Sequence, residues 1–183
     1  MQREGEFTRL LALYRDERPT RVLELGVGYG GSLFYWLRDA RRDAHVTVVA
    51  VDSFHEYDNR SLFDDWVPDN VELHVIDGRT SELNTVARVY AIVPDEFDWV
   101  FIDADHSYGS ALLDWKLYGQ HAHTVVFHDI RSDPRIHPEI EVGRLFDELC
   151  ERYEWLELAD QPAPEGWGGL GVIWPGRSWA SSR

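Results

Sequence analysis

The sequence predicts an α/β protein with a Rossmann-like open sheet and helices on both faces, and three observations support this. Short apolar runs of strand length recur along the 183 residues. Stretches with apolar residues at helical spacing lie between most of these runs, which favours parallel strands joined by helices. A run rich in glycine, from Gly26 to Gly31, follows the first apolar run, where a helix should begin. No repeat or linker divides the chain, so we expect a single domain over residues 1–183.

The expected elements follow one another along the chain. Apolar residues at helical spacing predict a short N-terminal helix over residues 6–15, and the first 19 residues leave little chain for a lid. Five strands are expected at residues 21–25, 46–51, 71–75, 99–102 and 125–127, and helices at 32–41, 81–92, 108–119 and 141–153. The link between the second and third strands shows no clear pattern. Residues 154–174 predict an antiparallel hairpin at the sheet edge, with strands at 155–159 and 169–174 around a turn over 161–168.

Composition argues against several classes of partner. The chain has 33 Asp and Glu against 18 Lys and Arg, which gives a formal net charge of -15. Such a surface repels nucleic acid and anionic lipid, so we expect neither as a partner. The single cysteine, Cys150, provides no disulfide framework, and no apolar run resembles a signal peptide or reaches membrane-spanning length. We therefore expect a cytoplasmic protein.

The glycine run predicts a bound small molecule. Glycine permits positive φ and lets a ligand approach the main chain, while the helix that follows offers unpaired N–H groups at its N-terminus. We expect Gly26, Gly28 and Gly30 to form part of a cofactor site.

Acidic residues follow the predicted strands, at the sheet edge where ligands of open parallel sheets bind. Asp52 ends the second strand, 24 residues beyond Gly28, at a spacing suited to a group that accepts hydrogen bonds from ribose hydroxyls. The residues that we expect to contact a cofactor beyond the glycine run are Ser53, Asp77, Gly78 and Asp103. Each aspartate also has a simpler interpretation as a turn or cap residue.

Glu24 indicates which cofactor this is. The glycine spacing and Asp52 alone would also suit a nicotinamide dinucleotide. A carboxylate two residues before Gly26 would repel a pyrophosphate, whereas it would suit a ligand that carries a cationic amino acid. S-adenosylmethionine has that cation, has a ribose for Asp52, and has no phosphate.

These residues resemble the class I S-adenosylmethionine-dependent methyltransferases over nearly the whole chain. Residues 22–31, 49–52 and 73–78 resemble the first three motifs of that family. The resemblance implies seven strands in the order 3-2-1-4-5-7-6, with the last strand antiparallel. Residues 97–108 and 126–130 are similar to small-molecule O-methyltransferases, among them catechol-type enzymes and macrolide-sugar and cephalosporin-tailoring relatives.

The resemblance also implies catalytic roles. Asp103, His128 and Asp129 would bind a divalent metal that holds the acceptor oxygen, and His106 would take the acceptor's proton as general base. Asp103 is thus both a catalytic and a cofactor-binding candidate. The relatives carry Asp-Asn or Glu-Asp where this chain has His128-Asp129. Imidazole is a poor ligand for magnesium and a better one for manganese, iron or zinc, so the metal differs or the site works without one.

The expected acceptor is a small hydroxylated molecule. Residues 54–60 and 131–137 are candidates for its contacts, and Arg135 and His137 would either meet an acidic acceptor or pair with neighbouring carboxylates. A second subunit in a homodimer would supply surface that the short N-terminus lacks. Two alternatives stay open: an NAD(P)-dependent oxidoreductase, and a non-catalytic cofactor-binding module of the same fold.

Overall fold

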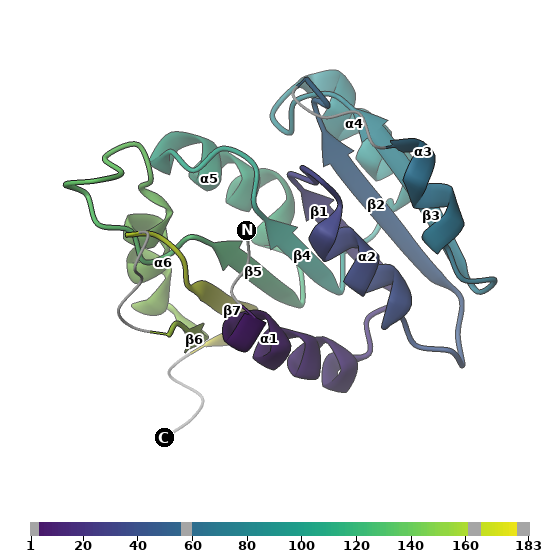
Figure 1. Ribbon diagram of the computed structural model, residues 1–183, viewed down its shortest axis with the longest axis horizontal. Coiled ribbons are helices and arrows are strands. Elements are labelled where there is room, and N and C mark those ends of the chain that lie inside the picture. Colours follow the sequence, from purple (N-terminus) through teal and green to yellow (C-terminus); the bar gives the residue numbers. More distant parts are fainter. Residues whose placement is uncertain (1–3, 56–59, 161–165, 179–183) are drawn as a thin grey trace.

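The computed structural model describes residues 4–55, 60–160 and 166–178. Its seven strands form one sheet in the order β3-β2-β1-β4-β5-β7-β6 (Figure 1). The strands are β1 (Arg21–Leu25), β2 (Val46–Asp52), β3 (Val71–Asp77), β4 (Trp99–Ile102), β5 (Thr124–His128), β6 (Tyr153–Leu158) and β7 (Leu170–Ser178). The pairs from β3 to β5 are parallel, whereas β7 runs antiparallel to both β5 and β6. The predicted fold class, strand order and reversed last strand are confirmed.

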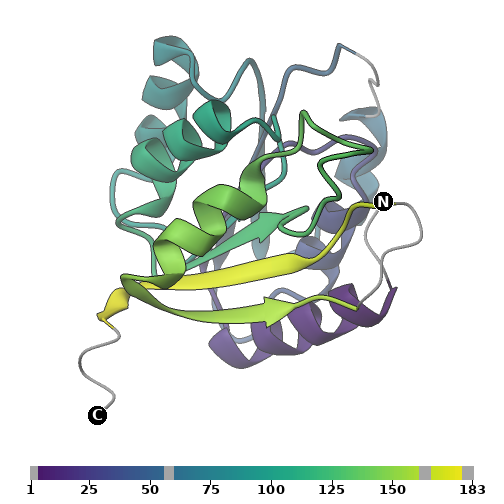
Figure 2. The ribbon, with the colours of Figure 1, turned by 90° about the vertical axis from the view of Figure 1, so that its left-hand side faces the viewer.

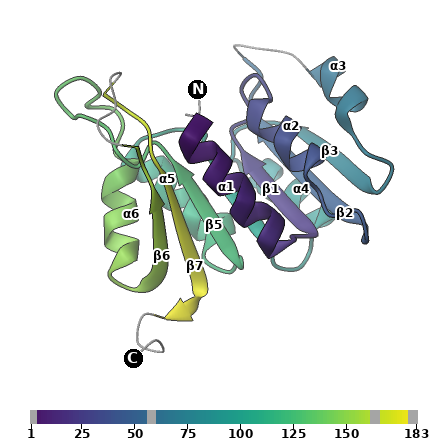
Figure 3. The same cartoon turned by 60° about the horizontal axis from the view of Figure 1, so that its bottom comes forward.

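Helices cover both faces of the sheet. The helical segments are α1 (Glu4–Glu17), α2 (Gly31–Arg38), α3 (Arg60–Phe63), η1 (Asp64–Trp66), α4 (Leu83–Ile92), α5 (Tyr108–Asp114), η2 (Trp115–Gly119) and α6 (Val142–Cys150). One hydrophobic core joins α1, α2 and α3 to one face of the sheet, and Figure 3 shows α1 beside α2 there. A second core joins α4, α5 and α6 to the other face (Figure 2). Along β1, Leu23 and Leu25 enter the second core, while Val22 faces the first with Glu24 on the same side.

The N-terminal helix α1 belongs to the first core. Tyr14 packs against the rings of Trp36 and Trp99, at centroid distances of 4.9 and 5.2 Å, and its hydroxyl donates to the carbonyl of Trp36 at 3.1 Å. Glu6 is buried and accepts backbone hydrogen bonds from Asp160 and Gly169 in the segments that flank the β6–β7 turn. These contacts fix α1 against the sheet.

Several boundaries differ from the sequence prediction. The first crossover helix stops at Arg38 instead of residue 41, because Asp39 caps it and pairs with Arg15 and Arg38. The segment that lacked a clear pattern contains α3 and η1. The helix expected over residues 108–119 is α-helical only to Asp114 and continues as a π-helix. The predicted turn at 161–168 and the acceptor segment at 54–60 lie partly outside the described residues.

None of the helices in the described part of the chain is long and apolar enough to cross a membrane.

Candidate active site

A pocket of about 870 Å³ opens at the carboxyl ends of the parallel strands. Its walls come from four segments, residues 26–32, 51–55, 78–81 and 103–105, together with Ser110 on α5. Of the predicted cofactor-binding residues, six line it: Gly26, Gly28, Asp52, Ser53, Gly78 and Asp103. The volume lies in the range typical of small-molecule sites.

The glycine-rich loop needs its glycines for different reasons. Gly26 has a φ of 89°, and a Cβ there would lie 2.2 Å from the Asp103 carbonyl oxygen, so only glycine lets this loop lie against the end of β4. Gly28 lines the pocket, and no atom lies within 4 Å of the place where its Cβ would be. Gly30 does not line the pocket; a Cβ there would meet the rings of Phe63 and Trp66.

Asp52 holds this loop through its backbone. Its Oδ2 accepts hydrogen bonds from the amides of Val27 and Gly28, at 2.7 and 2.9 Å, and its Oδ1 accepts one from Phe54 at 2.9 Å. Amides of this kind bind the pyrophosphate of a dinucleotide in other glycine-rich loops. Here a carboxylate already occupies them, which disfavours a dinucleotide. Because each carboxylate oxygen accepts two hydrogen bonds, the Oδ1 of Asp52 can still accept one from a ribose hydroxyl.

Glu24 lies beneath the loop and reaches the pocket through Ser32. Its side chain has no exposed surface, its Oε1 accepts a hydrogen bond from the Ser32 hydroxyl, and its Oε2 has no hydrogen-bond partner among the described residues. Burial raises the pKa of Glu24 well above its ordinary value, and the nearby charges of Asp103 and Asp52 add to this. A cation in the pocket would lie beside the carboxylates of Asp52 and Asp103 and would favour ionisation of the buried Glu24 beneath them. Sequence reasoning missed Ser32, whose only signal is its position in the first turn of the helix after the glycines.

Asp77 lies apart from the pocket. Its side chain is 54% exposed and its Oδ2 accepts a hydrogen bond from Arg60 at 3.1 Å. β3 is an edge strand, and the last residue of that strand projects outward while the following Gly78 lines the pocket. At the end of β3, Gly78 lines the pocket, whereas the predicted cofactor-binding residue Asp77 does not.

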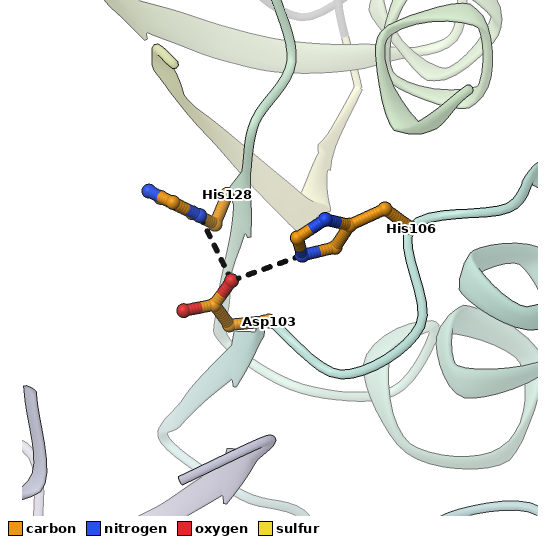
Figure 4. A group of neighbouring side chains, drawn as sticks. All are labelled: Asp103, His106 and His128. Atoms are coloured by element: carbon orange, nitrogen blue, oxygen red, sulfur yellow. Dashed lines mark hydrogen bonds and ion pairs between the residues drawn. The ribbon is translucent and has the colours of Figure 1, made fainter. Parts of the chain in front are cut away.

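A second group of polar side chains adjoins the pocket beyond Asp103 (Figure 4). The Asp103 Oδ1 lies 3.2 Å from His106 Nε2 and 2.8 Å from His128 Nδ1. Asp129 contacts both histidines, because its Oδ2 lies 3.3 Å from His106 Nδ1 and its Oδ1 lies 3.2 Å from His128 Nδ1. Asp129 has a φ of 57° and is 1% exposed. Residues from the ends of β4 and β5 therefore form one connected group, as expected from neighbouring parallel strands.

Charge pairing dominates the electrostatics of this group. Burial alone would raise the pKa of Asp103, but the two histidines outweigh it and lower that pKa well below its usual range. Burial likewise opposes protonation of His128, yet Asp103 and Asp129 raise its pKa to about 10. The pKa of His106 is also raised, because the hydrogen bond and charge of Asp103, with the charge of Asp129, exceed the effect of burial. Both carboxylates therefore favour the protonated form of His128.

The donor atoms in this group also suit a metal ion. Atoms of Asp103, His106 and His128 all lie within 4.8 Å of one another. One carboxylate and two imidazoles fit manganese, iron or zinc better than magnesium. From the sequence we expect Asp129 as the third ligand, whereas in the structure His106 completes this set. The buried Asp129 Oδ1 has no well-directed hydrogen bond among the described residues and faces His128, so Asp129 would orient that ligand.

The acceptor candidates after β5 are held by pairs of their own. Arg135 binds Asp133 through two hydrogen bonds, and its side chain is 87% exposed. His137 pairs with Glu139 and packs against the edge of Trp167, with centroids 6.4 Å apart. Both residues pair with carboxylates, as one of the two sequence interpretations proposed.

Comparison with known proteins identifies the class to which this fold and site belong. A family model described as a methyltransferase domain matches residues 23–130, from β1 to the segment after β5. The match spans more than half of the chain, and the chain belongs to this family of methyltransferase domains. No curated protein matches the sequence. The family match and the occupied loop amides together disfavour an oxidoreductase.

Solved structures share the fold. The O-methyltransferase TomG from Streptomyces achromogenes, solved with S-adenosylmethionine, is 25% identical with a TM-score of 0.60, covering 93% of this chain and 78% of that one. An O-methyltransferase from Bacillus cereus, solved with S-adenosylhomocysteine, is 17% identical with a TM-score of 0.64, covering 93% and 80%. MycE of the mycinamycin pathway, solved with Mg and S-adenosylhomocysteine, is 19% identical with a TM-score of 0.57, covering 93% and 48%. This chain thus spans about half of MycE.

Proposed function

We propose that this protein is an S-adenosylmethionine-dependent O-methyltransferase that acts on a small hydroxylated molecule, with His106 as general base. The observation that carries the proposal is the position of Asp103. Its backbone lies against Gly26 and lines the pocket, while its carboxylate contacts His106. One residue thus joins a cofactor-sized pocket to a group that can take a proton.

The charges around the pocket support this choice of cofactor. The sulfonium and the ammonium of S-adenosylmethionine are both cations. Asp52 and Asp103 line the glycine end of the pocket, and Glu24 is buried beneath it. With the amino acid near Glu24 and Asp103 and the ribose at Asp52, the wall at residues 78–81 would hold the adenine. TomG and the Bacillus cereus enzyme, which share the fold, were solved with this cofactor or its product.

The chemistry assigned to His106 follows from its two contacts. The base is the neutral form of His106, whose one proton lies on Nδ1 toward Asp129. The acceptor hydroxyl approaches the unprotonated Nε2 in place of the Asp103 carboxylate and gives up its proton there as the oxygen attacks the methyl carbon. The C–S bond breaks, its electron pair stays on sulfur, and S-adenosylhomocysteine leaves. Asp129 remains at Nδ1, where it orients the ring and stabilises the imidazolium that forms. Most of the rate enhancement would come from holding the methyl donor and the acceptor hydroxyl in line.

A divalent metal on Asp103, His106 and His128 would lower the pKa of a bound acceptor hydroxyl. That role and the role of base compete for His106, because a nitrogen that binds a metal cannot accept a proton.

The class of acceptor follows from the charge of the chain and from the enzymes that share its fold. A net charge of -15 disfavours nucleic acid, and α1 packs into the core instead of covering the pocket. TomG and MycE belong to the pathways of tomaymycin and mycinamycin, both small molecules. We assign a small phenolic or sugar hydroxyl to this site.

The test is methyl transfer from labelled S-adenosylmethionine to a panel of phenols, catechols and deoxysugars, measured by release of S-adenosylhomocysteine. The proposal expects release with at least one hydroxylated acceptor and loss of that release in His106→Ala. Transfer only to amines, or transfer that survives His106→Ala, would contradict the assignment of acceptor or base. Tight S-adenosylhomocysteine binding without transfer to any compound class would favour the non-catalytic module.

A further inference from the structure

The pocket wall at residues 78–81 is held from behind by α5 and the π-helix that follows it. The Tyr118 hydroxyl donates to the Thr80 carbonyl at 2.6 Å. The Thr80 side chain faces the carboxylate of Asp114, the last residue of α5. Two residues of one continuous helical segment thus contact the backbone and the side chain of one pocket residue.

Asp114 is unusual among buried residues of this chain. Its side chain is 1% exposed, and neither carboxylate oxygen has a well-directed hydrogen bond among the described residues. The charge of another acid, Asp105, further opposes its ionisation. Burial of an acid without a cation costs stability, so packing of α5 does not explain an aspartate at this position. Its neighbours on the helix, Ala111 and Trp115, are buried apolar residues.

The geometry of the helix explains why Asp114 and Tyr118 both face Thr80. The π-helix Trp115–Gly119 begins directly after Asp114, and such insertions are frequent at functional sites because they redirect side chains. Tyr118 is further fixed by stacking on Tyr90, with ring centroids 6.1 Å apart and an interplanar angle of 14°. Tyr90 lies on α4, which follows the pocket wall in the chain.

We propose that Asp114 and Tyr118 are positioning residues that hold Thr80, and with it residues 78–81, in place for the nucleoside end of the cofactor. This inference rests on the proposed function, which places the adenine at this wall. Neither residue lines the pocket, so both act through Thr80.

Tyrosine substitutions offer a matched pair for the test. Tyr118→Phe removes the hydrogen bond to Thr80, whereas Tyr90→Phe removes a similar hydrogen bond from the stacked ring to the Leu117 carbonyl, which is not part of the pocket. Calorimetric titration with S-adenosylhomocysteine should show binding weakened about fivefold in Tyr118→Phe and unchanged within about twofold in Tyr90→Phe. In turnover, Tyr118→Phe should raise the KM for S-adenosylmethionine while kcat stays near wild type.

Asp114 is tested by the contrast between Asn and Ala. Asp114→Asn keeps an acceptor opposite Thr80 and should retain S-adenosylhomocysteine binding, while Asp114→Ala should weaken it. Wild-type affinity in both Tyr118→Phe and Asp114→Ala would overturn the inference, as would equal weakening in both Tyr→Phe variants. If wild-type protein fails to bind S-adenosylhomocysteine, the proposed function itself fails and this inference falls with it.

Discussion

The imidazole of His106 lies between two carboxylates, with Nε2 3.2 Å from Asp103 and Nδ1 3.3 Å from Asp129. Asp103 comes from the end of β4 and faces the cofactor pocket, whereas Asp129 follows β5 and is buried. The ring therefore has one nitrogen toward a residue that lines the pocket and one toward a buried carboxylate. Substitutions of His106, the proposed base, and of Asp129, its buried partner, can therefore be compared.

His106→Ala and Asp129→Asn should both lower kcat and leave cofactor affinity near wild type. Loss of a general base typically costs about a hundredfold or more in rate. Asp129→Asn keeps the shape but loses the charge that stabilises the imidazolium, so its loss should be smaller. His137→Ala, which removes a histidine paired with Glu139, serves as control. Steady-state kinetics that show His137→Ala as impaired as His106→Ala would contradict the assignment.

Glu24→Gln should weaken cofactor binding without harming the fold. The substitution removes a buried carboxylate whose Oε2 has no hydrogen-bond partner among the described residues, so stability should stay level or rise. A cationic amino group loses a charged neighbour, which should reduce S-adenosylhomocysteine affinity about tenfold. Calorimetry and thermal melting measure the two effects. Unchanged affinity would show that Glu24 only supports Ser32.

Gly26→Ala and Gly28→Ala should separate folding from binding. At Gly26 the added methyl group meets the Asp103 carbonyl in a backbone conformation with positive φ, so we expect a loss of about 2 kcal/mol or more in unfolding free energy. At Gly28 the methyl group enters open pocket space, with a stability loss of about 1 kcal/mol and a larger loss of cofactor affinity. Chemical denaturation measures the stability loss and calorimetry the affinity loss. A larger stability loss in Gly28→Ala than in Gly26→Ala would contradict this description of the loop.

Asp114 should make stability depend on pH between about 4 and 6. Burial raises its pKa from 3.8 to about 6, so the folded state holds this proton more tightly than the unfolded chain. The stabilisation of the folded state by this proton is fully present below pH 3.8 and is lost as the pH rises through 6. The free energy of unfolding changes by about 3 kcal/mol over this range. Asp114→Asn should therefore be more stable than wild type at pH 7 and similar to it near pH 4. Denaturant titrations of both proteins at pH 4 and pH 7 measure this. An equal difference in unfolding free energy between the two proteins at both pH values would exclude the burial penalty.

His128 should set metal preference. The melting temperature of the wild-type protein should rise more with manganese or zinc than with magnesium, because two of the three donor side chains are imidazoles. His128→Asp should shift that preference toward magnesium. Melting curves with each ion and with EDTA give a readout that does not depend on turnover. If no ion shifts the melting of either protein, the metal role is excluded and His106 acts as a base alone.

The fold and the glycine-rich half of the site could be predicted because they depend on local pattern. Gly26 and Asp52 lie at strand ends that periodicity locates, and parallel pairing then brings those ends together. The family resemblance alone placed His106 and Asp129 in one site, as base and metal ligand, and their direct contact was not predicted because it joins two separate loops.

Other features depend on side-chain direction, which one sequence does not reveal. Asp77 was expected after the third strand and is the last residue of β3, yet its side chain pairs with Arg60 and does not line the pocket. Ser32 and Tyr118 carry no motif. The π-helix that directs Tyr118 to Thr80 has the same apolar spacing as an ordinary helix, so its effect on the pocket could not be foreseen.

Calorimetric titration of the wild-type protein with S-adenosylhomocysteine, compared with NAD, tests the central claim most directly. The charges of Glu24, Asp52 and Asp103 and the occupied loop amides predict saturable one-to-one binding of S-adenosylhomocysteine and none of NAD. Binding of NAD in the absence of S-adenosylhomocysteine binding would contradict the account.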